Sequence, residues 1–301
     1  MKELKWTRKT TQKIAHELKS LDVDVSPNTV CRLLKNLKYS LKVNHKKKES
    51  GTKNPPKPAD RNKQFEYIAD FRDRFAKEGD PTISVDTKKK EQIGDFKNNG
   101  TSWQQDAILV NDHDFPSDAR GKASPYGIYD TQRNKGTVML GISHDTPRFA
   151  VESIVSWWKT EGKENYPNSN QLLILADSGG SNSSRSRVWK YKIQERLCDQ
   201  FGLTVNVSHY PPGSSKWNPI EHRLFSEISK NWAGRPLDSV ETALKYIRTT
   251  KTTTGLTVKA HFVRKKYERG EKVTDRKMKN LSLTKHETFP EWNYTLSPSR
   301  M

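Results

Sequence analysis

The spacing of apolar residues near the start of the chain predicts two short helices. Apolar side chains recur at helical intervals within residues 10–21 and again from Val30 to Leu37, and a period near 3.6 residues is typical of an amphipathic helix. Ser26 suits the N-cap of the second helix, and Pro27 suits its first position. The sequence therefore predicts a helical hairpin in this part of the chain.

The polar face of the second predicted helix suits contact with DNA. It carries Thr29, Arg32, Lys35 and Asn36. Two short helices with a tight turn and a basic second face are typical of a helix-turn-helix, whose second helix enters the major groove. Small helical hairpins with basic faces also occur in other proteins, so the pattern alone leaves both interpretations open.

A polar, proline-containing segment follows this hairpin. Residues 44–58 read NHKKKESGTKNPPKP and contain no large apolar side chain, so they predict a linker. Their lysine run is typical of a solvated tether, although a basic tether also suits DNA phosphates. We therefore expect a helix-turn-helix DNA-binding region in residues 1–43 and a basic linker in residues 44–64.

After the linker, the pattern changes to that of a mixed α/β domain. Leu172–Ala176 is an unbroken apolar run, which is typical of a strand buried on both faces. In chain order we expect a helix from Phe65 to Phe75, a strand at 82–87, a hairpin of strands at 125–131 and 136–143, a helix at 151–158, the strand at 172–176, a helix at 189–197 and a strand at 203–208. This order favours a mixed sheet flanked by helices, which we place in residues 65–236.

Three acidic residues stand where such a sheet places its functional groups. Asp86 ends the first predicted strand, Asp177 follows the buried strand, and Glu221 lies in the first turn of a helix that begins at Asn218 and Pro219. Ligands of open α/β sheets bind at the carboxyl ends of strands. Converging carboxylates repel one another, and Mg²⁺ relieves that repulsion. Two ions about 3.5–4 Å apart would stabilise the attacking and leaving oxygens of a phosphoryl displacement.

Each of these acids also has a structural interpretation. Asp86 and Asp177 suit turns, and Glu221 suits the positive end of its helix. The spacing alone therefore leaves open both a metal site and three structural acids. Other catalytic signatures are missing from the sequence, because the eight histidines form no HExxH motif and there is no GxSxG motif or P-loop.

The charge distribution indicates a polyanionic partner. The 301 residues carry a formal net charge of +19. Residues 1–64 hold 17 basic and 6 acidic residues (+11), residues 65–221 hold 20 and 21 (−1), and residues 222–301 hold 17 and 8 (+9). Basic ends around a near-neutral centre suit nucleic acid held at both ends, although lysine-rich flanks also raise solubility. We expect a basic C-terminal extension in residues 237–301, which suits either DNA or a solvated surface.

Several classes of protein are excluded. The sequence contains no run of 18 apolar residues, so it predicts no membrane span. The first residues also lack the apolar core of a secretory signal. Cys31 and Cys198 are the only cysteines, and they form no CxxC motif. This excludes a disulfide framework and a cysteine-rich zinc site, and it fits a reducing compartment. We therefore expect a cytoplasmic, nucleoid-associated protein without a membrane partner.

Several longer motifs resemble those of one family. They are SVDTKKKE at 84–91, PYGIYD at 125–130, LADSGGSN at 175–182, HYPPGSSKWNPIEHRLF at 209–225 and WNYT at 292–295. In these motifs the sequence resembles the ISAzo13-type DDE transposases, the Rhodopirellula transposase family, from about residue 8 to the C-terminus. The segment that begins at residue 211 is also similar to the PPYSPxLNPIE element of IS630 and mariner transposases.

The resemblance implies an RNase H-like catalytic domain in which Asp86, Asp177 and Glu221 form the DDE triad. It also implies two Mg²⁺ ions, for which Mn²⁺ can substitute, cleavage at transposon ends by water, and strand transfer by the freed 3′-hydroxyl. Transposases of this type pair two ends of double-stranded DNA through a homodimer or a higher assembly. Four more residues match family motifs without an assigned role: Ser181, Asn182, Asn218 and His222.

The start of the chain bears on its ability to transpose. Longer family members carry more sequence before the helix-turn-helix, so the chain resembles an N-terminally truncated copy that lacks one DNA-recognition element. Two other functions stay open: a DNA-binding repressor without catalysis, and a nuclease of the same fold that cuts without joining. Metal-dependent cleavage of end-sequence DNA excludes the repressor, and joined products exclude the nuclease.

Overall fold

The structure is a computed structural model that describes residues 7, 9–41, 56–102 and 104–299. The chain divides into two compact units, Met1–Glu49 and Ser50–Met301, which are described separately. Most of the predicted linker lies outside the described residues. Its last part is helical, because helix α3 (Pro58–Glu78) already begins at Pro58.

The N-terminal unit contains the two predicted helices, α1 (Thr11–Lys19) and α2 (Pro27–Asn36). Ser26 is the N-cap of α2, and its hydroxyl accepts a hydrogen bond from the backbone N–H of Thr29 (3.1 Å). Thr10 caps α1 in the same way. The predicted start of the second helix is therefore confirmed.

This two-helix unit covers only part of its own apolar face. Val30 is buried, whereas Leu33 and Leu37 of the same predicted stripe are exposed. A pair of helices this short has little area against which to bury a full stripe. The helical period thus predicted the element correctly, but it did not predict the burial of each residue.

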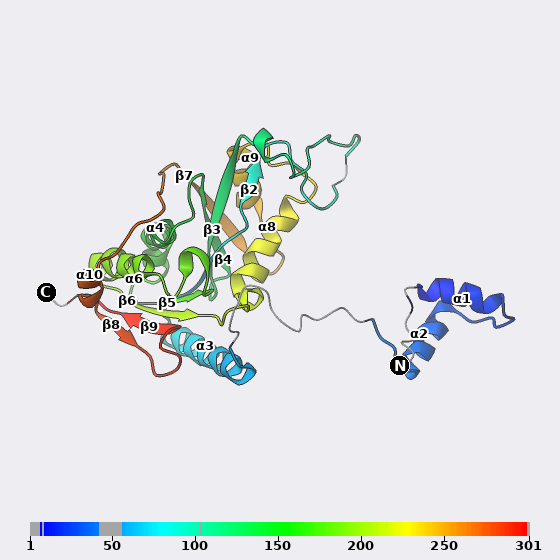
Figure 1. Cartoon of the computed structure of the whole chain (residues 1–301), viewed down its shortest axis with the longest axis horizontal. Coiled ribbons are helices and arrows are strands. Elements are labelled where there is room, and N and C mark those ends of the chain that lie inside the picture. The colour runs from blue at the N-terminus through cyan, green and yellow to red at the C-terminus, as the bar shows by residue number, and fades with distance from the viewer. Residues whose placement is uncertain (1–6, 8, 42–55, 103, 300–301) are drawn as a thin grey trace. The chain divides into compact units, whose positions relative to one another are not determined.

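Nine strands in the described part of the second unit form one sheet (Figure 1). They are β1 (Thr82–Thr87), β2 (Glu91–Ile93), β3 (Gly121–Asp130), β4 (Lys135–Gly141), β5 (Gln171–Ala176), β6 (Thr204–His209), β7 (Thr257–Val263), β8 (Leu283–Lys285) and β9 (Asn293–Leu296). Eight of them lie in the order β7-β4-β3-β1-β5-β6-β9-β8, and β2 pairs with β3.

The five central strands have the order β4-β3-β1-β5-β6. Strand β3 is antiparallel to both of its neighbours, whereas β1, β5 and β6 run parallel to one another. This is the arrangement of an RNase H-like sheet, so the expected fold class is confirmed. Strand β5 lies between two parallel strands and is fully buried from Leu172 to Ala176, as its unbroken apolar pattern predicts.

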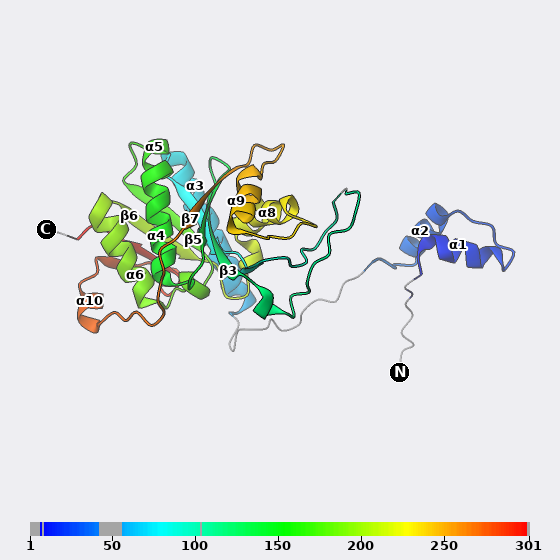
Figure 2. The same cartoon turned by 90° about the horizontal axis from the view of Figure 1, so that it is seen from above.

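Helices cover both faces of the sheet (Figures 1 and 2). On one face, α4 (Pro147–Trp157) and α6 (Arg187–Ile193) pack in a core that includes Ile174. On the other face, α3 packs on Leu175. Successive side chains of a strand point to opposite faces. Ile174 and Leu175 therefore each contribute to a different core.

The remaining helical segments are short. They are η1 (Pro116–Asp118), η2 (Trp158–Gly162), α5 (Lys163–Asn165), η3 (Gly180–Asn182), η4 (Gln194–Cys198), α7 (Asp199–Phe201), η5 (Ser215–Trp217), η6 (Glu221–Phe225), α8 (Ser226–Asn231), α9 (Val240–Thr249) and α10 (Asp275–Lys279). Across the described ranges, no helix combines the length and the apolar character that a membrane span requires.

Residues after 237 complete the sheet on both sides. Strand β7 pairs in parallel with β4, and β9 pairs antiparallel with β6. Helices α8 and α9 pack together on one face of the sheet, over strands β3 and β4. The segment 237–301, expected as a basic extension, is therefore built into the same sheet as the predicted catalytic residues.

Candidate active site

The register of the parallel strands places two of the three predicted acids side by side. Val85 of β1 pairs with Ala176 of β5. Asp86 and Asp177 are the next residues on these two neighbouring strands, at their carboxyl ends. This end of a parallel pair is where an open α/β sheet binds its ligands.

Glu221 reaches the same edge because its helix lies directly on a glycine. Gly127 of β3 pairs with Asp86 of β1. A Cβ atom at Gly127 would lie 2.5 Å from the Phe225 ring and 2.8 Å from Cδ1 of Ile220. Only a residue without a side chain allows the segment 220–225, which contains Glu221, to approach the strand beside Asp86 so closely.

Ser84 and Asn218 join the start of this helix to β1. The Ser84 hydroxyl donates a hydrogen bond to Oδ1 of Asn218 and accepts one from the N–H of Ile220 (3.1 Å). The amide of Asn218 donates to the carbonyl oxygen of Val85 (3.4 Å). Ser84 and Asn218 are both fully buried. Asn218, a motif residue without an assigned role, therefore positions Glu221 relative to β1.

A buried chain of hydrogen bonds holds the backbone at Asp177. The indole N–H of Trp189 donates to the hydroxyl of Tyr294 (2.9 Å), and this hydroxyl lies 3.2 Å from Nε2 of His209. Nδ1 of His209 lies 2.8 Å from the carbonyl oxygen of Asp177. Nδ1 therefore carries the proton, and Nε2 accepts from Tyr294. Burial lowers the pKa of His209 to about 4, so its ring is neutral near pH 7.

The loop after Asp177 is tied to the two neighbouring strands. Oδ1 of Asn182 accepts a hydrogen bond from the hydroxyl of Tyr126 on β3 (2.9 Å). The hydroxyls of Ser181 and Thr87 lie 3.3 Å apart. Both Ser181 and Asn182 are buried. These two motif residues therefore fix the loop rather than face solvent.

The three predicted carboxylates repel one another. Burial raises the pKa of Asp86, and the charges of Asp177 and Glu221 raise it further. Burial also raises the pKa of Asp177, where Glu221 adds to the effect and the N–H of Gly179 opposes it. Burial raises the pKa of Glu221, whereas Lys88 lowers it. The fold thus holds three acids close enough to disfavour their simultaneous ionisation.

This set of donors fits a hard divalent cation. Carboxylate oxygens are the ligands that Mg²⁺ and Mn²⁺ prefer, and a bound cation removes the repulsion between them. Lys88 has other partners, because its ammonium pairs with Glu91 and lies 4.8 Å from the centre of the Trp232 ring. Among the described residues, no three His, Cys, Asp or Glu side chains are already arranged as a metal-binding group.

A fourth acid, Asp145, lies at the same edge, and the sequence patterns did not single it out. It follows β4, which runs in the direction of β1 because β3 is antiparallel to both. Its charge raises the pKa of Asp86 and that of Asp177. Its place shortly after the carboxyl end of a strand is the signal that could have found it. It directly precedes Thr146, the N-cap of α4, so in the sequence it resembles an ordinary turn residue.

The residues predicted to contact DNA lie on α2 of the N-terminal unit. Arg32, Lys35 and Asn36 are exposed. Thr29 is half-buried, and its hydroxyl lies 3.0 Å from that of Ser26 in the helix cap. Three of the four side chains are therefore accessible to a ligand, while Thr29 takes part in the cap.

The fourth motif residue without an assigned role, His222, differs from the other three. It is exposed, and a nitrogen of its ring contacts the carbonyl oxygen of Lys216. This contact links the helix that carries Glu221 to the loop before it. The charge of His222 also lowers the pKa of Glu221.

A comparison with protein families identifies the class of the chain. The family described as the Rhodopirellula transposase DDE domain matches residues 1–298. The chain belongs to this family of DDE transposases. A comparison with curated proteins gave no match.

Among solved structures, the chain is similar to complexes of the Mos1 mariner transposase. The paired-end complex with the left transposon end is 14% identical, with a TM-score of 0.46, over 79% of this chain and 65% of that chain. The strand transfer complex is 15% identical, with a TM-score of 0.47, over 79% and 64%. The paired-end complex with Mn is 12% identical, with a TM-score of 0.46, over 79% and 65%. The chain thus spans slightly less than two thirds of the length of these proteins.

Proposed function

We propose that the protein is a transposase that cleaves DNA at transposon ends and joins the freed end to target DNA. It would use two Mg²⁺ ions held by Asp86, Asp177 and Glu221. The observation that carries this proposal is the convergence of these three carboxylates at the carboxyl ends of β1 and β5. Membership of the DDE transposase family supports the reaction class.

The chain's own residues would hold and orient the reacting groups. Bound Mg²⁺ ions supply charge stabilisation for the attacking and leaving oxygens of an in-line displacement at phosphorus. Asp86 lies on a central strand, and the buried His209 fixes the backbone at Asp177. Asn218 holds the start of the helix that carries Glu221. All three ligands therefore lie on backbone that is fixed before DNA binds, which lowers the cost of reaching the reactive geometry.

The rest of the chain would bind the DNA. We propose that residues 1–43 recognise DNA through Thr29, Arg32, Lys35 and Asn36, and that the segment before α3 links this region to the catalytic domain. The basic segment 237–301, whose strands complete the sheet of that domain, would hold flanking or target DNA. The partner is double-stranded DNA, and two ends would be paired by a homodimer or a larger assembly. Such a protein would act in the cytoplasm, associated with the nucleoid.

The test is a cleavage and joining assay. The full chain is incubated with labelled DNA that carries the inverted repeats flanking its gene, together with a target plasmid. We expect cut and joined products with Mg²⁺ or Mn²⁺, binding with little chemistry in Ca²⁺, and no reaction in EDTA. Glu221→Gln serves as the inactive control.

Three other results would contradict the proposed mechanism or indicate another function. Cleavage in EDTA would contradict the metal mechanism. Cleavage with Mg²⁺ but without joined product would indicate a nuclease. Binding to the repeats without cleavage in any metal would indicate a repressor.

A further inference from the structure

The acidic edge of the sheet extends to Asp145. Hydroxyl groups of Thr87 and Ser181 face its carboxylate and stabilise the charged form. Thr87 directly follows Asp86 on β1, and Ser181 lies in the loop after Asp177. Asp145 therefore lies beside residues that follow Asp86 and Asp177 in the sequence.

One carboxylate oxygen of Asp145 has no partner. Oδ1 is buried and accepts no hydrogen bond from the described residues. Burial raises the pKa of Asp145, and the nearby positive charge belongs to Lys90, whose side chain is exposed. A buried carboxylate oxygen without a donor is costly. The fold thus keeps this oxygen in a place where nothing in the described chain satisfies it.

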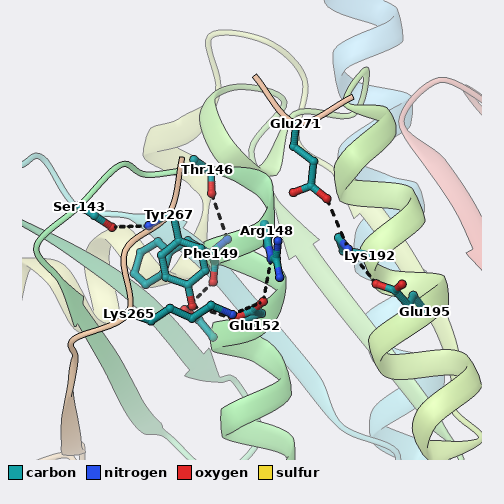
Figure 3. A network of polar contacts seen from close by, with 11 residues as sticks. Ser143, Thr146, Arg148, Phe149, Glu152, Lys192, Glu195, Lys265, Tyr267 and Glu271 are labelled. Atoms are coloured by element: carbon teal, nitrogen blue, oxygen red, sulfur yellow. Dashed lines mark hydrogen bonds and ion pairs between the residues drawn. The ribbon is translucent and has the colours of Figure 1, made fainter. Parts of the chain in front are cut away.

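The segment that carries Asp145 is fixed on both sides. The hydroxyl of Ser143 accepts a hydrogen bond from the N–H of Tyr267 (3.0 Å), and Nδ1 of His144 lies 3.2 Å from the Tyr267 carbonyl oxygen. Thr146 caps the first turn of α4. Figure 3 shows Tyr267 beside the start of this helix, between Ser143 and the side chains that α4 presents. Asp145 is therefore held in place before any ligand binds.

The segment that contains Tyr267, residues 264–274 (the strap), also contacts the helices α4 and α6. The hydroxyl of Tyr267 donates to Glu152 of α4 (2.8 Å), and Lys265 pairs with the same carboxylate (2.6 Å). Further along the strap, Glu271 pairs with Lys192 of α6 (3.4 Å; Figure 3). These contacts account for the order of the segment around Asp145 without involving the Asp145 carboxylate.

We propose that Asp145 is a fourth acidic ligand of the metal centre. Its free Oδ1, together with Asp86 and Asp177, takes a divalent cation. This inference rests on the proposed function, because it adds a ligand to that metal site. Mg²⁺ demands near-octahedral coordination, so two ions have about twelve coordination positions to fill. A fourth carboxylate replaces water at one of these positions, and Oδ1 of Asp145 gains a partner.

Binding of Mn²⁺ to the full chain without DNA tests this ligand. Calorimetry and the electron paramagnetic resonance signal of free Mn²⁺ give the number of bound ions and their affinity. Asp145→Asn should weaken Mn²⁺ binding by at least the roughly 10- to 100-fold that loss of an outer-shell group causes, or remove one ion. Asp130→Asn is the matched control. Asp130 is also a buried acid at the end of a strand, but Tyr166 and backbone N–H groups occupy its oxygens.

A comparison with Asp86→Asn separates failure of this inference from failure of the proposed function. If Asp86→Asn weakens Mn²⁺ binding while Asp145→Asn binds like Asp130→Asn, the fourth ligand is refuted and the proposed site stands. If neither Asp86→Asn nor Asp145→Asn weakens binding, both ideas are refuted. If only Asp145→Asn weakens it, the triad is wrong, and the metal site that Asp145 is proposed to share with Asp86 and Asp177 is refuted with it. Melting in EDTA verifies that each variant folds, and Asp145→Ser is titrated in the same way if the Asn variant does not.

Discussion

The two ends of the central strand β1 hold buried carboxylates in opposite ways. At one end, Asp130 pairs with Ile83 in the register of β3 and β1. The hydroxyl of Tyr166 donates to both of its oxygens (3.0 and 2.9 Å), and two backbone N–H groups of the following turn donate to Oδ1. At the other end, Asp86 faces Asp177, and these two acids repel each other.

Asp80 repeats the arrangement of the first end. It precedes β1, and its Oδ1 accepts a hydrogen bond from the hydroxyl of Ser169 (2.5 Å). Where an acid has a structural task, this chain therefore supplies its donors. Burial raises the pKa of Asp130, Asp86 and Asp177 alike, and backbone N–H groups lower all three, that of Thr87 at Asp86 included (2.7 Å). Only at the carboxyl end of β1 do neighbouring carboxylates raise the pKa further, which is a usual sign of a site kept for a ligand.

The largest expected effect comes from neutralising the acids at the carboxyl end of β1. Asp86→Asn, Asp177→Asn and Glu221→Gln each keep the shape of the side chain and remove one anionic ligand. Each should lower the single-turnover rate of cleavage by roughly 10³-fold or more, and a double variant should be about as slow as the slower single one, because a site that acts as a unit fails once. DNA binding, measured by gel shift, should persist.

Asp130→Asn is the control for this experiment, and it should cleave at the normal rate while it is folded. The comparison between the two strand ends breaks if Asp130→Asn is inactive and Glu221→Gln cleaves normally. In that case the third ligand would be misassigned. The pairing of Asp86 with Asp177 at neighbouring strand ends would still stand.

The next effect concerns stability at the satisfied end. Asp130→Ala leaves the buried hydroxyl of Tyr166 and two backbone N–H groups of the turn without their acceptor, so the free energy of unfolding should fall by about 3 kcal/mol. Urea denaturation followed by tryptophan fluorescence measures the change. Asp112→Ala, at an exposed position, is the surface control and should stay within about 0.5 kcal/mol of the parent. Equal stability of the Asp130→Ala and Asp112→Ala variants would refute a structural role for Asp130.

Acid should weaken the backbone support beneath Asp177. The pKa of His209 is lowered from 6.5 to about 4, so the folded state favours the neutral ring. The resulting stability is present above pH 6.5 and is lost as the pH falls through the range from 6.5 to 4, with a loss of about 2–3 kcal/mol at the lower limit. Unfolding measured at several pH values gives the slope. His209→Gln should show a shallower slope, and an equal slope in both proteins would contradict the neutral relay.

The central part of the fold was predictable because its signals are local. The apolar run Leu172–Ala176 predicted a strand buried on both faces, and Ser26 predicted the start of α2. The two acids at the strand ends follow from the same pattern, since parallel strands end at one edge of a sheet.

Other parts depend on partners that are distant in the sequence. Gln64 is polar but fully buried, because its amide donates to Asn293 and to the carbonyl oxygen of His209. A hydrophobic pattern cannot detect such a pair, and the predicted linker therefore extended into α3. Strands β8 and β9 are too short for a clear period. Asp145 gains its neighbours Thr87 and Ser181 only through the fold.

The smallest expected effect is a gain in the free energy of unfolding, opposite to the loss expected for Asp130→Ala. Burial and the neighbouring carboxylates disfavour the charged form of Asp86, so a neutral isostere removes a cost that the folded state carries near pH 8. In EDTA, Asp86→Asn should therefore raise the free energy of unfolding by about 1 kcal/mol. With Mg²⁺ the order should reverse, because the cation binds the folded parent and stabilises it by mass action, while the variant has lost a ligand. Thermal melting of both proteins, with and without Mg²⁺, measures this crossing. A variant that is less stable than the parent in EDTA would show that the Asp86 carboxylate is satisfied by the protein itself, as that of Asp130 is, and the contrast between the two ends of β1 would then be lost.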